Sequence, residues 1–334
     1  MSEFLDGIIV RAKADKQTIV LPEGNDERTL QAAQNVLEQD IANVIILGDE
    51  AAIRKSSYRL DGAQIVDPST SDKTEGFAET LAKLREKKGL TLDQAREMVK
   101  DVLYFGVMMV YSGLADGMVS GACHATGDVL RPALQILKTA PGTKLVSAFF
   151  LMAVPDCPYG DKGRFVFADC ALNQNPNAEE LSEIAIASAA SYKSLVGSEP
   201  KVAMLSYSTY GSAHSELVDK VVEATRMARE KAPQLALDGE LQLDAAIVDS
   251  VAKSKAPQSA VAGQANVLVF PDLNAGNIGY KLVQRLGKAE AYGPILQGIA
   301  RPVNDLSRGC TADDITGVIA VTCVQSQNRK AQDR

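Results

Sequence analysis

A serine and an arginine stand side by side near the end of the chain, directly before an expected helix. They are Ser307 and Arg308, and Thr311 and Asp314 follow them. The last two have the spacing of a capping box, which predicts a helix from Thr311 to Gln327. A helix N-terminus offers free N–H groups, Ser307 a hydroxyl and Arg308 a planar set of donors. These groups suit a phosphate or another oxyanion, although the spacing alone favours a plain cap and a surface salt bridge.

Two further arginines lie near expected helix ends. Arg131 lies in the first turns of the expected helix Asp128–Leu137, where the helix dipole disfavours a cation. That position fits anion binding. The simpler explanation is a salt bridge to Asp128, which is also suited to cap the helix. Arg85 lies at the end of the expected helix Thr74–Lys87, where basic residues are ordinary. Its position alone therefore indicates nothing.

Hydroxyl and amide side chains follow two other expected strands. Ser206, Ser208 and Thr209 stand between a strand and the expected helix Ala213–Lys231, and Asn274 follows another strand. Ligands of parallel α/β sheets bind beyond the carboxyl ends of the strands. These residues are therefore candidates for substrate binding, and helix capping explains them about as well.

Metal ligands and nucleophiles are few. The chain has 2 His and 5 Cys and no paired Cys-x-x-Cys or His-Glu-x-x-His motif, so no metal site is expected. His124, after a strand, is interpreted as a hydrogen-bonding loop residue with acid–base chemistry as the alternative, and His214 as a structural residue at a helix start. Cys310 lies beside the candidate anion site, where a lowered thiol pKa is one reading and inert packing the other. Glycine-rich nucleotide loops are missing too, which removes the main support for a dinucleotide or nucleoside triphosphate cofactor.

Composition excludes several classes of protein. The 334 residues carry 35 Lys plus Arg against 42 Asp plus Glu, a net charge of −7, so an extended nucleic-acid surface is not expected. No apolar run reaches the roughly 20 residues of a membrane span. Acidic residues near the N-terminus argue against a signal peptide, and an odd number of scattered cysteines suits a reducing compartment. We expect a cytoplasmic protein.

Short apolar strands alternate with helix-length amphipathic segments along the chain. This order predicts βαβ units, mainly parallel sheets and an α/β fold. The expected strands at the start are Thr18–Leu21, Asn43–Leu47, Gln64–Val66 and Gly117–Ser120, with one helix expected over Thr91–Tyr111. The strands Lys144–Val154 and Arg164–Ala168 are expected to form a hairpin.

The motifs together resemble the short form of the phosphate acetyltransferase (phosphotransacetylase) family. The resemblance rests on His124 with Leu130–Ala133, Leu205–Thr209 with Gly211 and Ser212, Pro271–Asn277, Gly298, Arg301–Pro302, Ser307–Gly309, Asp313 and Asp314. It covers essentially the whole chain. It implies two α/β/α domains with mainly parallel sheets and the fold of the isocitrate/isopropylmalate dehydrogenases. Residues 1–144 with 296–334 would carry the Ser-Arg-Gly anion site, and residues 145–295 would close the cleft.

The same resemblance implies a homodimer that converts acetyl-CoA and phosphate reversibly into acetyl phosphate and CoA, with no bound cofactor. Asp314 would be the base for the CoA thiol. Arg308, helped by Arg131, would hold the phosphate, Ser307 would bind the acetyl carbonyl, and Arg85 would be a further substrate-binding residue. Direct attack by the thiolate in a ternary complex is expected rather than a covalent acetyl-enzyme.

Three alternatives stay open from the sequence. The first is a related enzyme for longer acyl chains, such as a phosphate butyryltransferase, because a pocket discriminates one methylene by only about 1–3 kcal/mol. The second is a catalytically silent module that senses acetyl-CoA. The third is a decarboxylating dehydrogenase, which would need metal-binding aspartates and a nucleotide loop that the sequence does not offer.

Overall fold

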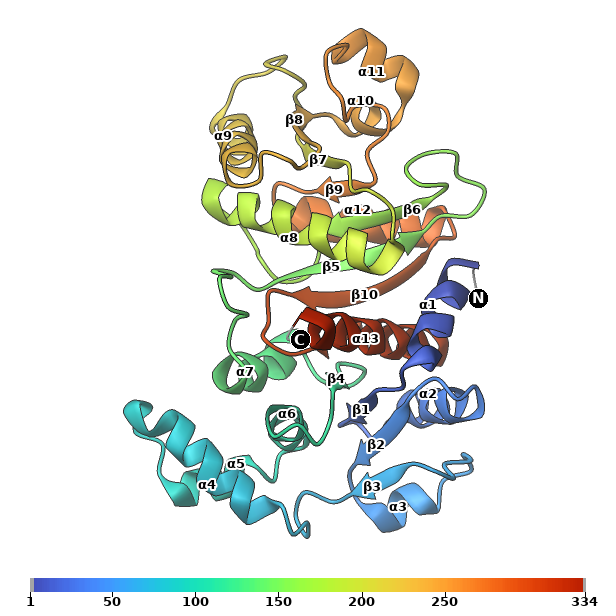
Figure 1. The fold of residues 1–334 in the computed structure, drawn as a ribbon, viewed down its shortest axis with the longest axis vertical. Coiled ribbons are helices and arrows are strands. Elements are labelled where there is room, and N and C mark those ends of the chain that lie inside the picture. Colours follow the sequence, from blue (N-terminus) through green and yellow to red (C-terminus); the bar gives the residue numbers. More distant parts are fainter. Residues whose placement is uncertain (1–2, 333–334) are drawn as a thin grey trace. The chain divides into compact units, whose positions relative to one another are not determined.

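The computed structural model describes residues 3–332, which form two compact units. The first unit consists of Glu3–Gly142 together with the C-terminal segment that begins at Ile299, and the second is Thr143–Gly298. Each unit contains a β-sheet with helices packed against it (Figure 1). The expected α/β fold with mainly parallel sheets is confirmed.

The sheet of the first unit is parallel throughout. Its strand order is β11-β4-β1-β2-β3. The strands are β1 (Thr18–Leu21), β2 (Asn43–Leu47), β3 (Gln64–Val66), β4 (Gly117–Val119) and β11 (Val303–Asn304). The bounds of β1 to β3 are those expected from the apolar runs. Strand β11 comes from the far end of the chain, and it completes the edge of the sheet beside β4.

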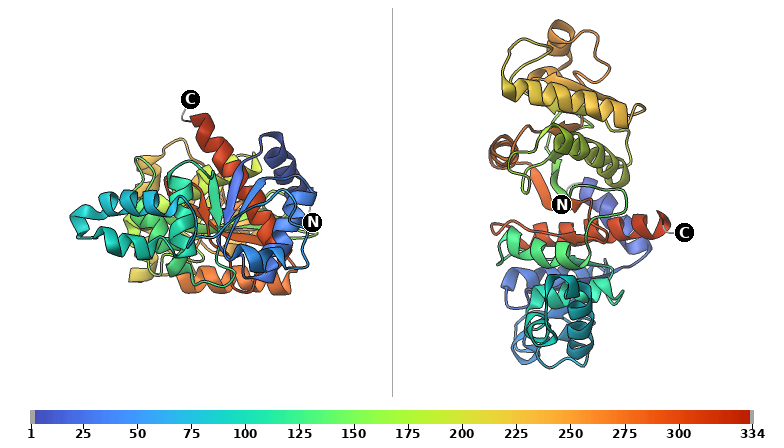
Figure 2. Two further views of the ribbon diagram at one scale, coloured as in Figure 1. Left: turned by 90° about the horizontal axis from the view of Figure 1, so that it is seen from below. Right: turned by 90° about the vertical axis from the view of Figure 1, so that its left-hand side faces the viewer.

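Helices cover both faces of this sheet. They are α1 (Glu3–Ala14), α2 (Glu27–Glu38), α3 (Glu50–Arg54), α4 (Thr74–Arg85), α5 (Leu92–Met98), α6 (Val102–Tyr111), α7 (Thr126–Ile136) and α13 (Ala312–Gln332). Helix α2 leads from β1 to β2, whereas α4 to α6 lead back from β3 to β4, so right-handed crossovers place these two groups on opposite faces. Helix α13 packs beside α1 and α2 (Figures 1 and 2).

Two helix predictions in this unit are wrong. The single helix expected over Thr91–Tyr111 is interrupted, because Asp101 caps a new helix by accepting hydrogen bonds from the N–H groups of Leu103 and Tyr104. Helix α7 starts at Thr126 with Ala125 as its N-cap, so Asp128 belongs to the first turn and does not cap the helix.

The second unit has a mixed sheet of strand order β10-β5-β6-β9-β7-β8. Its strands are β5 (Ser147–Ala153), β6 (Arg164–Ala168), β7 (Val202–Leu205), β8 (Leu237–Leu241), β9 (Val267–Val269) and β10 (Glu290–Gln297). The expected hairpin is confirmed as the antiparallel pair β5–β6. Sequence patterning misses β8, which carries polar residues at its centre, and β10, which contains Gly293 and Pro294.

The helices of the second unit are α8 (Ala178–Val196), α9 (Glu216–Lys231), α10 (Leu243–Ile247), α11 (Asp249–Lys255) and α12 (Leu273–Leu286). Aromatic pairs mark the core of each unit: Phe77 meets Phe105 edge to face at 5.0 Å in the first, and Phe150 stacks on Tyr280 at 3.8 Å in the second. Among the described helices none is long and apolar enough to cross a membrane.

Candidate active site

Three loops of the first unit leave the sheet at the same edge. The first loop (residues 22–26) follows β1, the second loop (residues 120–125) follows β4, and the third loop (residues 305–311) follows β11. Because β11, β4 and β1 are neighbouring parallel strands, their carboxyl ends lie side by side. Each loop leads into a helix N-terminus, that of α2, α7 or α13. The sheet therefore gathers three anion-favouring helix starts where ligands of such folds bind.

The third loop carries the serine and arginine singled out in the sequence. The Ser307 hydroxyl accepts a hydrogen bond from the Gly309 N–H at 3.3 Å, and its carbonyl accepts one from the Cys310 N–H at 2.8 Å, which makes a tight turn. The side chain of Ser307 is half-buried and that of Arg308 is exposed. The turn thus leaves the side chain of Arg308 exposed at the start of α13.

Helix α13 begins with the predicted capping box. The Asp314 carboxylate accepts the Thr311 N–H at 2.8 Å, and the Asp314 N–H donates to the Thr311 hydroxyl at 3.2 Å. The helix itself starts at Ala312 and extends beyond the expected end. The capping role of Asp314 is therefore confirmed, and this bond uses one of its two carboxylate oxygens.

Arg28 joins all three loops, although nothing in the sequence pattern singles it out. Its guanidinium pairs with Asp26 of the first loop at 2.8 Å and donates to the Ala122 carbonyl of the second loop at 2.7 Å. It also donates to the carbonyls of Arg308 at 2.8 Å and Cys310 at 3.2 Å in the third loop. These bonds orient the backbone of the third loop.

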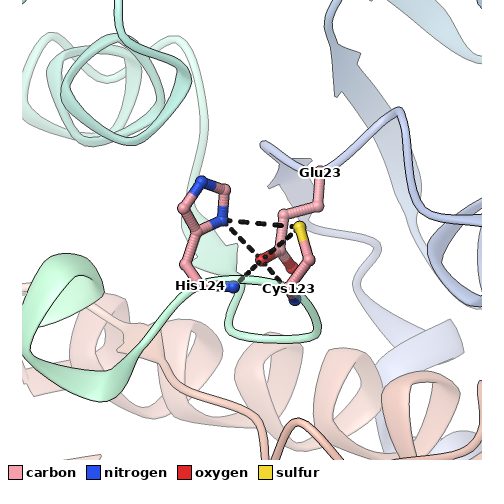
Figure 3. Close-up of side chains that lie close together, drawn as sticks. All are labelled: Glu23, Cys123 and His124. Atoms are coloured by element: carbon pink, nitrogen blue, oxygen red, sulfur yellow. Dashed lines mark hydrogen bonds and ion pairs between the residues drawn. The ribbon is translucent and has the colours of Figure 1, made fainter.

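Glu23 holds the second loop from within. Its side chain is 1% exposed and accepts the backbone N–H groups of residues 121–124 at 2.9–3.1 Å. Figure 3 shows the carboxylate between Cys123 and His124, and the His124 Nδ1 lies 2.7 Å from it. Burial alone would raise the pKa of Glu23, but these hydrogen bonds lower it below its ordinary value. The interpretation of His124 as a hydrogen-bonding loop residue is confirmed.

Glu23, Cys123 and His124 offer three donor atoms within 4.8 Å of one another, the geometry of a possible metal site. Burial raises the pKa of the Cys123 thiol to about 12, so the thiol stays protonated and donates to Glu23. The carboxylate is already saturated by N–H groups. A divalent metal at these atoms would have to displace the N–H groups that Glu23 accepts, so in this structure the carboxylate serves to hold the second loop.

The structure distinguishes between the two interpretations of Cys310. Burial raises its thiol pKa to about 11, Arg28 lowers it only in part, and Asp314 raises it further. The structure therefore supports the interpretation of Cys310 as a packing residue and not the alternative of a lowered thiol pKa. A thiol in this state is a poor nucleophile at neutral pH.

Arg131 and Arg85 both lie near Tyr104. Burial raises the pKa of Tyr104, and both arginines lower it. Arg131 is exposed and lies 3.5 Å from Asp128, as the simpler sequence reading expected, and Arg85 lines a cavity of about 720 Å³ with Lys88. Arg131 stands about one and a half turns into α7, the helix that starts beside the third loop.

The predicted residues of the second unit mostly brace its own loops. The Ser208 hydroxyl is buried and donates to Glu240 at 2.9 Å, and the Thr209 hydroxyl bonds Gln242 at 3.2 Å. Ser206 is half-buried and accepts the Ser208 N–H at 3.2 Å.

Two other residues of this unit lie at helix starts. Asn274 is exposed in the first turn of α12, which Asp272 caps by accepting the Ala275 N–H at 3.0 Å. His214 precedes Ser215, the N-cap of α9, so its assignment to the first residues of a helix is wrong by two positions.

The fold is that of an α/β protein with three helix N-termini at one edge of a parallel sheet, and comparison with known proteins names its family. The phosphate acetyl/butaryl transferase model matches residues 3–323. A phosphate acetyltransferase of Acetivibrio thermocellus is 62% identical over 330 residues, which are 98% of this chain and 99% of that protein. One of Thermoanaerobacterium thermosaccharolyticum is 59% identical over 326 residues, 97% of this chain and 99% of that protein.

Solved structures agree with the sequence comparison. A crystal structure of a phosphotransacetylase from Streptococcus pyogenes has a TM-score of 0.91 and 48% sequence identity, and it covers 98% of this chain and 100% of that one. The chain belongs to the phosphate acetyl/butaryl transferase family. The expected resemblance is confirmed.

Proposed function

We propose that the third loop, held by Arg28, carries out acetyl transfer between CoA and phosphate. The chain is a phosphate acetyltransferase, an enzyme that converts acetyl-CoA and phosphate reversibly into acetyl phosphate and CoA. The observation that carries the proposal is the position of Ser307, Arg308 and Asp314 in the turn and first helical turn at the start of α13.

Asp314 is the proposed base for the CoA thiol. A thiol of pKa about 8.5 is only a few per cent ionised at pH 7, so a positioned acceptor helps. The capping bond from Thr311 fixes the carboxylate in one orientation. The proton of the thiol passes to Asp314 as the sulfur attacks the acetyl carbonyl of acetyl phosphate.

Arg308 and Ser307 are the proposed ligands of the reacting groups. The exposed Arg308 guanidinium presents paired donors to the phosphoryl group, and Arg131 adds a second cation along α7. Ser307 donates to the carbonyl oxygen as it gains charge. The phosphate then leaves with the electron pair of the broken C–O bond. Arg85, at the end of α4 and near Tyr104 of α6, is proposed to bind the substrate farther from the reacting atoms.

Direct transfer is favoured over an acetyl-enzyme. Cys310 is the one cysteine of the third loop, and burial raises its thiol pKa to about 11. Two substrates held together gain several kcal/mol of orientation, roughly 7–11 kcal/mol in ideal models. The reaction therefore proceeds in a ternary complex without bound cofactor, and CoA acts as a substrate.

The second unit and a second subunit complete the proposal. The hydroxyl-rich loop that follows β7, on which Tyr207 and Tyr210 are exposed, is the proposed contribution of the second unit to substrate binding. A homodimer is proposed from the family, and an exposed apolar stripe on α12, formed by Ile278, Leu282 and Leu286, offers a surface for it.

Five free cysteines support a cytoplasmic location.

A coupled assay tests the function. Acetyl-CoA formation from acetyl phosphate and CoA is followed with a chelator present, with butyryl phosphate as the alternative substrate. We expect a rate that the chelator does not change and a preference for acetyl phosphate. Initial-rate plots should intersect, as for a ternary complex. Absence of a rate would indicate a sensor module, and parallel plots with trapped acetyl-enzyme would contradict direct transfer.

The homodimer has its own test. Leu282 is 52% exposed in the middle of the stripe. Sedimentation of the wild type should give twice the mass of one chain, and Leu282→Lys should shift the mass toward one chain. A monomeric wild type would contradict the proposal.

A further inference from the structure

A buried carboxylate that the proposed reaction does not use lies two residues before Ser307. Asp305 follows β11 directly, and its side chain is 0% exposed. One of its carboxylate oxygens, Oδ1, has no hydrogen-bond partner within residues 3–332. A buried polar atom without a partner costs free energy, so the position is held for another reason than stability.

The contacts of Asp305 join two loops of the site. The Thr126 hydroxyl donates to its Oδ2 at 2.6 Å, and Thr126 is the first residue of α7, which carries Arg131. On the other side lies Gly121 of the second loop, where a Cβ atom would be 2.2 Å from the Oδ1 of Asp305. The φ of Gly121 is +117°, so glycine is needed there on both grounds. The second loop is thus shaped around the carboxylate.

Two buried carboxylates on either side of Gly121 have opposite environments. Glu23 receives several N–H groups, and its pKa is low despite burial. Burial raises the pKa of Asp305 to about 7, and the bond from Thr126 and the nearby backbone N–H of Leu306 offset burial only in part. Glu23 raises this pKa further, and Arg308 lowers it. The contrast indicates that Asp305 changes its protonation near neutral pH.

We propose that Asp305 is a positioning residue for the anion site of Ser307 and Arg308, and that its protonation strengthens anion binding there. The inference rests on the proposed function of the third loop. An ionised Asp305 repels an anion held by Arg308, so anion binding and protonation favour each other. The charged groups that act on Asp305 are Glu23 of the first loop and Arg308 of the third. The elements packed around it also carry Cys123 and His124, which bond Glu23, and the ion pair of Asp128 and Arg131 on α7.

Sulfate tests the link to protonation, because its charge is constant between pH 6 and 8.5. Its dissociation constant is measured from the rise in melting temperature with sulfate concentration, which needs no turnover. In the wild type the dissociation constant of sulfate should increase about 10-fold from pH 6 to 8.5. This change corresponds to a difference of about one unit between the pKa of Asp305 with and without bound sulfate. Asp305→Asn should remove most of this change, to about 2-fold or less. The matched control Asp61→Asn, an exposed residue before β3, should behave as the wild type.

Thr126→Val tests the positioning role separately, because it keeps the charge of Asp305 and removes the bond to it. We expect kcat to fall about 10-fold. Sulfate binding should stay pH-dependent, with its midpoint at a higher pH, because the lost bond lowers the pKa of Asp305 in the wild type. Thr80→Val on α4 is the matched control. Wild-type pH dependence of sulfate binding in Asp305→Asn, or wild-type kcat in Thr126→Val, would overturn the inference. If the wild type shows no acetyl transfer, the proposed function is contradicted instead. The sulfate titration would still test the role of Asp305, because it needs no turnover.

Discussion

Arg28 provides the sharpest structural prediction, because one side chain holds three loops. Its guanidinium donates to the carbonyls of Ala122, Arg308 and Cys310 at 2.7, 2.8 and 3.2 Å. Hydrogen bonds from a charged donor are worth about 1.5–3 kcal/mol when buried. The Arg28 side chain is 34% exposed, so we take about 1 kcal/mol for each bond. The three bonds together then contribute about 3 kcal/mol to the order of the site.

Arg28→Ala should therefore lower kcat/KM about 100-fold, because the third loop loses its orientation. Arg28→Lys should fall between the wild type and Arg28→Ala, since an ammonium keeps the charge beside Asp26 and lacks the planar fork. Initial rates of the coupled assay give both numbers. The control Arg54→Ala, which removes a surface ion pair to Glu50 on α3, should change kcat/KM little.

The kinetic pattern refines this test. A misplaced third loop affects the transition state more than ground-state binding, so kcat should fall more than KM rises. Circular dichroism and the melting temperature show whether the variant is folded. A folded Arg28→Ala variant with kcat/KM within about 3-fold of the wild type would refute the clamping role.

Three further predictions address the chemistry of the site. Cys310→Ala should keep substantial kcat in the coupled assay, since the proposed route needs no second nucleophile; complete loss in a folded variant would contradict direct transfer. Arg308→Lys should weaken sulfate competition with acetyl phosphate and restore only part of the activity lost in Arg308→Ala, and full activity would show that a point charge suffices. Asp305→Asn should gain stability relative to the wild type as pH rises from about 4 to 7 in urea titrations. Over this pH range the folded wild type keeps a proton on Asp305 that the unfolded chain releases, so the free energy of unfolding of the wild type falls by up to about 4 kcal/mol. Parallel curves of unfolding free energy against pH for the two proteins would contradict the raised pKa.

Local features of the site were predictable from the sequence. The capping box of Thr311 and Asp314 depends on residues three positions apart, and strands β1 to β3 depend on short apolar runs. Patterns of this kind are set by neighbouring residues, so a single sequence contains them. The helix interruption at Asp101 was missed because apolar residues continue on both sides of it.

The residues that hold the loops together were not predictable. Arg28 bonds carbonyls 94 and 282 positions away in the sequence, and Asp305 bonds Thr126 across 179 positions. Such contacts depend on β4 lying between β11 and β1, and the order of strands in a sheet is not encoded in a local pattern. Glu23 was missed for the same reason. A charged residue at the end of a strand, without an obvious helix to cap, is the signal that could have drawn attention to it.

The central claim is that Asp314 acts as a base as well as a cap, and one variant separates the two roles. Asn in its place still accepts the Thr311 N–H, so Asp314→Asn should keep the helix start and lose about 1 kcal/mol of stability or less. As the base, the change should lower kcat about 10²–10⁴-fold with near-normal CoA binding, and a higher pH should restore part of the rate. A folded Asp314→Asn variant that retains more than about a third of the wild-type kcat would contradict the account, because general-base loss is far larger.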